Sequence, residues 1–251
     1  MTAPIRKIQN WVLIRGLIRS QYHWKDFPAQ LEKSTEYNKV HLVELAGNGF
    51  LHQYDTPTDI LEAIDQLQAQ LPENLEHFGL IGISLGGMLA TKWAQLWPEK
   101  IKQLVLINSS SNLSPFYHRL MPHNYGSIIT SLVSPSAQKK EETILSMTVN
   151  QEEIWRRQLA ENTEFLEQHP IRKLNFFKQL QLTTQVDFNV VPACSKLILN
   201  SNADRLVHPS CSESIAKAWQ CLLMTHESAG HDLPLDDSEW VIQKINSSFE
   251  I

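Results

Sequence analysis

Glycine is scarce in this sequence. The chain contains nine glycines among 251 residues, about half of the roughly 7% that is usual. Eight of the nine lie within or just after apolar stretches that are typical of strands, and only Gly126 falls elsewhere. Sheets of the α/β class build their sites at strand ends, where tight turns and close backbone approach require glycine. This placement therefore predicts a site at the strand ends.

Neither a large charge nor a long apolar run is present. The formal net charge of -5 gives no electrostatic reason to expect binding to nucleic acid or to an anionic membrane. No apolar run approaches the about 20 residues of a membrane-spanning helix. Residues 11–18 are apolar, but Arg15 interrupts them and no signal-peptide cleavage site follows. The sequence therefore predicts a cytoplasmic protein without a membrane span that binds a small molecule.

Cysteine is limited to Cys194, Cys211 and Cys221. An odd number of cysteines without a Cys-x-x-Cys pair or a metal-type spacing favours reduced, packed thiols over a disulfide framework. Nothing in the sequence indicates a metal ion or another cofactor.

Short apolar runs alternate with helical patterns along most of the chain. Apolar spacing predicts strands over residues 11–14, 40–45, 77–83, 101–107, 196–200 and 221–225. It predicts helices over residues 22–31, 57–71, 85–97, 209–219 and 236–249. Thr56 is the expected N-cap of the helix over 57–71. Alternation of this kind implies right-handed crossovers, so the sequence predicts the α/β class with a mostly parallel sheet flanked by helices.

The segment 109–192 interrupts this alternation. It carries helix-like stretches over residues 137–149, 152–168 and 171–180 but no strand pattern. At roughly 80 residues it is much longer than an ordinary connection, and insertions of that length often bind a ligand or cover a site. We therefore expect a core formed by residues 1–108 and 193–251 and a helical cap inserted at 109–192. A passive helical layer is the alternative.

The most informative motif is Gly82-x-Ser84-x-Gly86, which lies directly between a buried-type strand and a helix. A turn as tight as this holds the serine in a strained backbone conformation and raises its hydroxyl above the sheet. Glycines and a serine that merely make a turn are the alternative. Because glycine is so scarce here, we favour Ser84 as a nucleophile.

A serine hydroxyl needs a base to take its proton, and the base needs a partner that fixes its tautomer and orientation. Asp204 and His231 each lie just beyond the end of a predicted strand, after Ser84 in the chain. The order Ser, Asp, His is the one associated with a nucleophile elbow. The competing residues are Asp232, Asp236 and Asp237 for the acid and His208 and His226 for the base.

With these motifs the sequence resembles the α/β-hydrolase fold family over nearly its whole length. The segment 82–86 resembles the family's nucleophile elbow, 201–207 its acid loop and 230–231 its histidine loop. The resemblance implies an α/β-hydrolase fold with a sheet of about six to eight strands, since the first two strands usual in the family have little room before Trp11. It also implies that Ser84 is the nucleophile, His231 the general base and Asp204 the orienting carboxylate.

The segment Arg15-Gly16-Leu17 resembles the family's oxyanion loop, and the resemblance implies that the backbone N–H groups of Leu17 and Leu85 form the oxyanion hole. The family pattern has His-Gly where this chain has Arg15-Gly16. Arg15, Gly16 and Arg19 are therefore candidate substrate contacts, with the two arginines holding an acidic group. Structural ion pairs are the alternative for both arginines.

These features predict a serine hydrolase that cleaves a carboxylic ester or thioester of a small molecule, including an acyl group bound to a carrier. Acyl transfer and carbon-carbon bond hydrolysis use the same three side chains, so the sequence does not separate them from ester hydrolysis. A noncatalytic binding module that kept the fold is the alternative from another class, because fold alone does not determine function.

Overall fold

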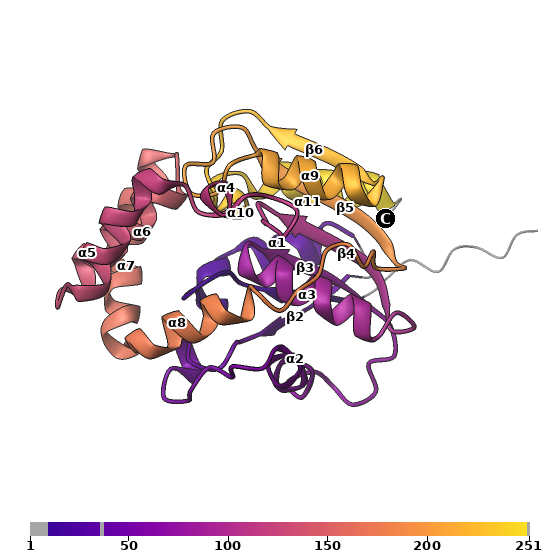
Figure 1. Ribbon diagram of the computed structural model, residues 1–251, viewed down its shortest axis with the longest axis horizontal. Coiled ribbons are helices and arrows are strands. Elements are labelled where there is room, and N and C mark those ends of the chain that lie inside the picture. The colour runs from indigo at the N-terminus through magenta and orange to yellow at the C-terminus, as the bar shows by residue number, and fades with distance from the viewer. Residues whose placement is uncertain (1–9, 36–37, 250–251) are drawn as a thin grey trace, which may run out of the picture.

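A computed structural model describes residues 10–35 and 38–249 of the chain. Residues 1–9 of the predicted core lie outside the described residues. Six parallel strands form one sheet in the order β2-β1-β3-β4-β5-β6 (Figure 1). The strands are β1 (Asn10–Ile14), β2 (Lys39–Val43), β3 (Phe78–Ile83), β4 (Ile101–Ile107), β5 (Ser195–Ser201) and β6 (Leu222–His226). The predicted fold class is confirmed.

Helices cover both faces of the sheet. Alternate residues of the strands pack against α2 (Ile60–Gln68), α3 (Leu85–Leu96) and α9 (Ser210–Trp219) on one face. They pack against α1 (Phe27–Lys33) and α11 (Ser238–Phe249) on the other. All six residues of β3 are buried, as expected of a central parallel strand that is covered on both sides.

Several helix boundaries differ from the sequence prediction, by up to three residues at the end of α2 and by two at each end of α8 (Lys173–Leu182). The helix expected from Pro57 begins at Ile60, because the Asp59 carboxylate caps it by accepting from the Leu61 N–H. The helix expected over 22–31 is divided into the 3₁₀ helix η1 (Gln21–Trp24) and α1. The helix expected over 236–249 is preceded by the short α10 (Leu233–Asp236). The predicted cap Thr56 instead donates its hydroxyl to the Ala46 carbonyl oxygen.

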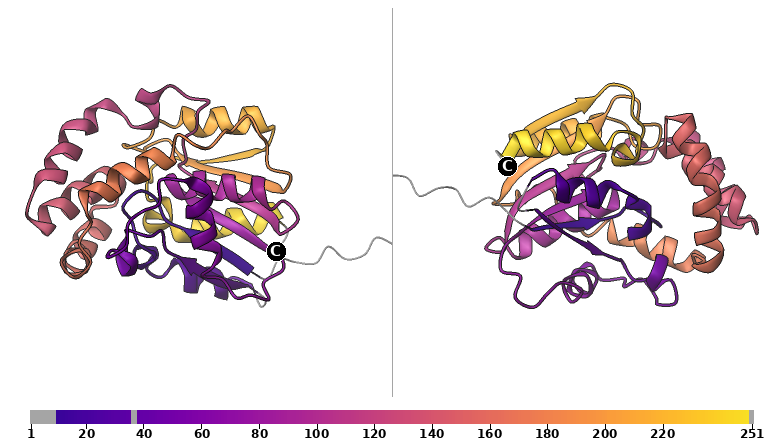
Figure 2. Two further views of the ribbon diagram at one scale, coloured as in Figure 1. Left: turned by 60° about the horizontal axis from the view of Figure 1, so that its bottom comes forward. Right: turned by 180° about the vertical axis from the view of Figure 1, so that it is seen from behind.

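The segment between β4 and β5 is helical (Figure 2). Its elements are α4 (Phe116–Arg119), η3 (Pro122–Asn124), α5 (Tyr125–Val133), α6 (Ala137–Thr148), α7 (Glu152–Gln168) and α8 (Lys173–Leu182). Figure 1 shows α5, α6 and α7 beyond one end of the sheet, with α8 returning toward the core. We call residues 109–192 the helical insertion. The sequence analysis did not predict α4, η3 or α5.

The three cysteines are free thiols. Burial raises the pKa of Cys194 and of Cys211 to about 11 and also raises the pKa of Cys221. Since the thiolate is the reactive form, these side chains are packed and unreactive. In the described part of the chain, no helix is both long enough and apolar enough to cross a bilayer.

Replacing Gly86 by alanine is expected to lower the free energy of unfolding by about 1–3 kcal/mol. The added Cβ would collide with backbone oxygens of the first strand end, including the Arg15 oxygen at 2.6 Å. Thermal unfolding measures the loss. Gly126→Ala on α5 is the matched control, because a Cβ there meets nothing within 4 Å. Equal stability of the two variants would contradict this account of the turn.

Candidate active site

Ser84 lies on a sharp turn between β3 and α3. Its backbone angles are φ 54° and ψ -119°, a strained region that residues other than glycine rarely adopt. The turn is held from both sides, since the Ser84 N–H donates to the Ile107 oxygen (3.0 Å) and the Ser84 carbonyl oxygen accepts from Gly87 N (3.0 Å). No room for a side chain exists at Gly82, where a Cβ would collide with the Gly86 backbone. The local geometry is therefore that of a nucleophile elbow.

His231 and Asp204 form a buried pair. The His231 Nδ1 atom lies 2.7 Å from Asp204 Oδ2, and the two side chains are 6% and 2% exposed. The other carboxylate oxygen accepts from the N–H groups of Leu206 (2.8 Å) and Val207 (3.0 Å). An acceptor at Nδ1 favours the proton on that nitrogen and leaves Nε2 free to act as a base.

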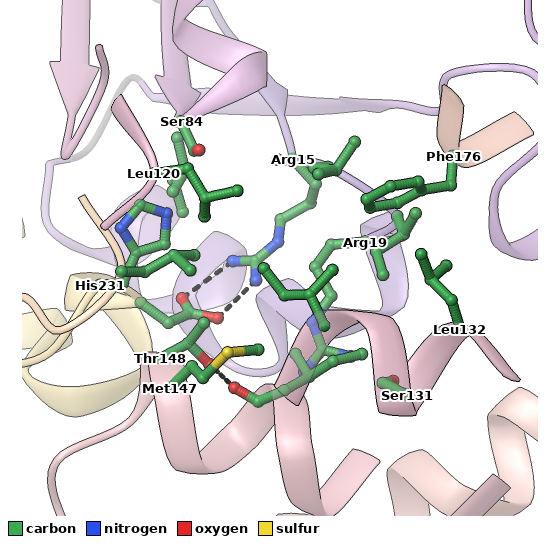
Figure 3. Close-up of a pocket in the computed structure, with 18 residues that line it drawn as sticks. Arg15, Arg19, Ser84, Leu120, Ser131, Leu132, Met147, Thr148, Phe176 and His231 are labelled. Carbon is green, nitrogen blue, oxygen red and sulfur yellow. Dashed lines mark hydrogen bonds and ion pairs between the residues drawn. The ribbon is translucent and has the colours of Figure 1, made fainter. Parts of the chain in front are cut away.

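Ser84 and His231 line one cavity at the carboxyl ends of β3 and β6 (Figure 3). Within the described residues no hydrogen bond joins the Ser84 hydroxyl to the imidazole. Catalytic hydrogen bonds are often long in a ligand-free enzyme and tighten when substrate binds. The structure therefore brings the predicted serine, histidine and aspartate to one place.

The competing acids have other partners. Asp232 pairs with Arg15, and Asp237 lies 3.2 Å from His226. Asp236 accepts from the N–H groups of Asn150, Gln151 and Gly230. Burial raises the pKa of Asp236. Among the described carboxylates, only Asp204 bonds to the His231 ring.

The first strand-helix loop runs beside Ser84. A Cβ on Gly16 would lie 3.2 Å from Ser84 Cβ, so the loop passes close to the serine and a side chain at position 16 would crowd it. Leu17 lines the cavity. The Leu17 and Leu85 N–H groups have no acceptor among the described residues. Leu85, which directly follows Ser84, is buried and does not line the cavity, so the oxyanion hole stays a prediction.

A buried amide network holds this loop. Ile18 has φ 53°, and its N–H donates to Gln179 Oε1 at 2.8 Å. Gln179 lies on α8 and is fully buried. Its Nε2 donates to Asn48 Oδ1 at 2.7 Å, and Asn48 Nδ2 donates to the Arg19 carbonyl oxygen at 3.1 Å. Through this network the helical insertion holds two backbone groups of the loop, the Ile18 N–H and the Arg19 carbonyl oxygen.

The two arginines of this loop are paired with carboxylates. Arg15 makes two bonds to Asp232, at 3.0 and 2.5 Å, and its guanidinium lies 4.9 Å from the centroid of the Trp24 ring. Arg19 makes two bonds to Glu141 on α6, at 2.9 and 2.8 Å. The structural ion pairs considered from the sequence are therefore present, although both arginines also line the cavity.

The rest of the cavity wall is largely apolar, apart from side chains such as Ser131 and Thr148, and comes from both the core and the helical insertion. Its apolar residues are Leu17, Ile18, Ile83, Leu120, Ile128, Leu132, Ile144, Met147, Phe176 and Leu206. Six of these ten belong to the insertion. The insertion therefore supplies most of the apolar residues of this wall, and its role as a cap stays a prediction.

A model of the Alpha/beta hydrolase family matches residues 11–244. The chain belongs to this family. The pimeloyl-[acyl-carrier protein] methyl ester esterase of Aliivibrio fischeri is 36% identical over 103 residues, which are 41% of this chain and 37% of the relative. Protein NDRG4-A of Xenopus laevis is 30% identical over 146 residues, which are 55% of this chain and 32% of the relative. The matches thus span about a third of the length of these relatives.

Solved structures show the same fold as this hydrolase-family chain. The 2-hydroxy-6-oxo-6-phenylhexa-2,4-dienoate hydrolase from Rhodococcus superposes with a TM-score of 0.77 at 16% identity, over 98% of this chain and 92% of that one. A lipase-esterase related protein from Clostridium acetobutylicum superposes with a TM-score of 0.69 at 16% identity, over 96% and 95% of the two chains.

Two positions of this α/β hydrolase that the sequence analysis passed over also shape the site. The Asn108 amide donates to the carbonyl oxygens of Gly230 (3.2 Å) and His231 (2.8 Å) and accepts from Ser201 N–H (2.9 Å). The second position is Gln179, described above. No pattern in the sequence points to either amide. A pattern does point to α5, which contributes to the cavity wall. Ile128 and Leu132 are four residues apart in a stretch, 120–138, that has no lysine, arginine, aspartate or glutamate.

No group of three or more histidine, cysteine, aspartate or glutamate side chains that could hold a metal ion occurs in residues 10–35 and 38–249.

Two buried titratable groups, His23 and Glu44, lie near the arginines of the first strand-helix loop. Burial, with the nearby charges of Arg19 and Arg15, holds the pKa of His23 well below its usual value. Burial also raises the pKa of Glu44 to about 7, against donation from the Ser20 hydroxyl.

The raised pKa of Glu44 has a measurable effect on stability. Its ordinary value is 4.5, so the fold holds this proton more tightly than the unfolded chain does. The resulting stabilisation is complete below pH 4.5 and is lost as the pH rises through about 7. Glu44→Gln keeps an acceptor and removes the titration. Between pH 4 and pH 8, the free energy of unfolding of this variant should rise by about 3 kcal/mol relative to that of the unsubstituted protein.

Denaturant titrations at the two pH values measure this difference for Glu44→Gln. Glu153→Gln is the control, because Glu153 is exposed on α7 and its replacement should give no such trend. A stability difference for Glu44→Gln that is the same at both pH values would show that Glu44 does not titrate in this range.

Proposed function

We propose that this α/β hydrolase cleaves a carboxylic ester or thioester through an acyl-enzyme formed on Ser84. The observation that carries the proposal is the convergence, on one cavity, of the strained Ser84 and the His231–Asp204 pair. A serine at a tight turn can be explained by the requirements of the turn alone. A serine that shares its cavity with a carboxylate-oriented imidazole has the groups that nucleophilic catalysis requires.

In the proposed reaction the Ser84 oxygen attacks the carbonyl carbon of the substrate while His231 Nε2 takes the hydroxyl proton. The Leu17 and Leu85 N–H groups donate to the oxyanion of the tetrahedral intermediate. Collapse of the intermediate expels the alcohol or thiol, which receives the proton from His231. Water, activated by the same nitrogen, then releases the acid and restores Ser84.

Each group has a separate task in this scheme. Asp204 holds the imidazole with Nε2 toward the serine and stabilises the imidazolium that forms. The backbone donors act on charge that develops only in the transition state, and one such donor contributes about 3–4 kcal/mol in comparable sites. The N–H groups of Leu17 and Leu85 have no acceptor among the described residues, which supports their use as the donors of this scheme.

The cavity and the relatives support an acyl group as the bound part of the substrate. The wall is largely apolar, and one relative is named for a methyl ester of an acyl group on a carrier protein. We therefore include a carrier-bound acyl ester or thioester among the substrates. The free thiols support a cytoplasmic location, where thiols stay reduced.

Exposure to a fluorophosphonate, followed by intact mass and peptide mapping, tests the proposal. One adduct on Ser84, absent from Ser84→Ala and slow to form in His231→Ala, is expected. Active protein should then hydrolyse p-nitrophenyl esters and acyl thioesters. A folded protein that neither forms the adduct nor hydrolyses these substrates would contradict the proposal and favour a noncatalytic binding module.

A further inference from the structure

The charges around the cavity are matched. Arg15 and Arg19 are the cations of its wall (Figure 3), and each makes two bonds to one carboxylate. Asp232 neutralises Arg15, and Glu141 neutralises Arg19. All four side chains are at least nine-tenths buried. One carboxylate therefore balances the charge of each cation, although Arg15 Nε has no hydrogen-bond partner among the described residues and Arg19 uses only Nη1 for its two bonds.

The groups behind these pairs add no positive charge. His23 is buried beside the two arginines, which disfavours its charged form. Glu44 is buried near Arg15 and is a source of negative charge when ionised. On the other side of the cavity, His231 is paired with Asp204. Lys25 near His23 is itself paired with Glu161, so the two arginines and the groups behind them each have a carboxylate partner or are held uncharged by burial.

We propose that the cavity selects uncharged, apolar acyl chains and rejects chains that end in a carboxylate. The inference rests on the proposed esterase function, whose bound acyl group it specifies. An anionic end would lose its hydration inside an apolar wall and find no free cation to replace it. This is the reverse of what two arginines in a loop beside the nucleophile suggest from the sequence.

A matched pair of substrates tests the selection. p-Nitrophenyl hydrogen adipate carries a terminal carboxylate at pH 8, and p-nitrophenyl methyl adipate has the same chain with that end as a neutral ester. The concentration of active enzyme is first measured from the amount of fluorophosphonate adduct that forms. We expect kcat/KM to be at least about 100-fold higher for the methyl ester, because burial of an unpaired charge is strongly unfavourable. A ratio below about threefold, or one favouring the acid, would overturn the inference.

Binding separates this inference from the esterase function. Ser84→Ala should bind methyl adipamate at least about tenfold more tightly than adipamic acid in calorimetric titrations, and this comparison needs no turnover. If the unsubstituted protein forms no adduct and hydrolyses neither ester, the esterase proposal fails and this affinity ratio still decides the selection. Equal affinities would overturn the selection even in an active esterase.

The variant Glu141→Gln tests whether the pairing of Arg19 with Glu141 causes the preference for uncharged chains. This variant leaves Arg19 unpaired beside the cavity, so the preference for the methyl ester should fall at least tenfold. The double variant Arg19→Gln with Glu141→Gln has no charge at either position and should keep the preference of the unsubstituted enzyme. Glu153→Gln on the exposed face of α7 is the control. An unchanged ratio in Glu141→Gln would show that the Arg19 pair does not set the selection. If this variant does not fold, the double variant decides, and loss of the preference there would overturn the inference.

A different observation concerns Gln179. This fully buried side chain reaches from α8 to the loop that carries Leu17, and it accepts from the N–H of the next residue, Ile18. Ile18 has φ 53°, a conformation that is unfavourable for a β-branched residue unless its surroundings impose it. We infer that Gln179 is a positioning residue, which fixes the direction of the Leu17 N–H through Ile18.

Gln179→Met removes the acceptor at similar volume and should lower kcat at least tenfold while KM stays within about threefold, because the Leu17 donor acts in the transition state. Gln179→Glu keeps an oxygen facing Ile18 N–H and should recover part of the loss. Asn175→Leu is the matched control. Asn175 is also fully buried on α8, but it bonds to Thr56 N–H and to the Tyr54 and Gly47 oxygens rather than to this loop.

Asn175→Leu should destabilise the protein and leave kcat within about twofold. Equal losses of kcat in Gln179→Met and Asn175→Leu would show that Gln179 has only a structural role. A Gln179→Glu variant with no recovery over Gln179→Met would contradict the inference as well. Thermal unfolding of all three variants separates lost folding from lost turnover.

Discussion

Ser84→Ala is expected to lower kcat/KM for an ester substrate by about 10⁴ to 10⁶-fold, with little change in the temperature of unfolding. The hydroxyl makes no hydrogen bond to another described residue, so its removal leaves the fold intact and takes away only the attacking atom. The remaining rate would come from the oxyanion donors and from binding. Initial rates with a p-nitrophenyl ester, corrected for spontaneous hydrolysis, measure the loss.

The matched control for this variant is Ser131→Ala. Ser131 lies on α5 and lines the same cavity, but it is an ordinary helical residue and does not stand on a strained turn at a strand end. Its replacement should leave kcat/KM within about threefold. If Ser84→Ala kept more than about a hundredth of the original rate, another group would have to be the nucleophile, and the acyl-enzyme scheme would be wrong.

Asp204→Asn should lower kcat by about 10⁴-fold. The amide has nearly the same shape, so the bonds from the Leu206 and Val207 N–H groups to the side-chain oxygen persist. The NH₂ group then faces His231 Nδ1 and donates to it, which places the imidazole proton on Nε2. The ring can no longer accept the serine proton. Single-turnover acylation by a p-nitrophenyl ester measures this step directly.

The chain contains its own control for Asp204→Asn. Asp237 and His226 form a second histidine–aspartate pair, at 3.2 Å, which does not line the cavity. Asp237→Asn removes a carboxylate from a histidine in the same way and should leave kcat within about threefold. A larger loss of kcat in Asp237→Asn than in Asp204→Asn would show that Asp204 is not the orienting carboxylate.

The sequence predicted the sheet well because its signals are local. All six strands lie where apolar runs indicate them, and β4 has the predicted bounds. The turn at Ser84 is also local, since Gly82 allows the start of α3 to approach the end of β3. Gly86 has a different role, because it allows α3 to pass close to the backbone of Ile14 and Arg15. Where two local signals compete, the prediction was less accurate. Asp59, rather than Thr56, caps α2, because the Thr56 hydroxyl is already bonded to the Ala46 oxygen.

The site beyond the serine depended on contacts between distant segments. α5 was missed because its nine residues are bordered by turn-forming residues and have no helix-stabilising charges. Its Ile128 and Leu132 nevertheless form part of the cavity wall. Gln179 and Asn108 carry no sequence pattern at all, since an amide side chain becomes informative only when its partners are known.

The sequence by itself determined the family, the order of strands and helices along the chain, and the candidate serine, aspartate and histidine, because spacing and glycine placement act over a few residues. Only the tertiary structure decided the charge of the cavity. Arg15 and Arg19 find their carboxylates 217 and 122 residues away in the chain, and no local pattern announces such a partner. A buried charge is defined by what lies beside it in space, so only the fold shows that each of the two candidate anion contacts is paired with a carboxylate.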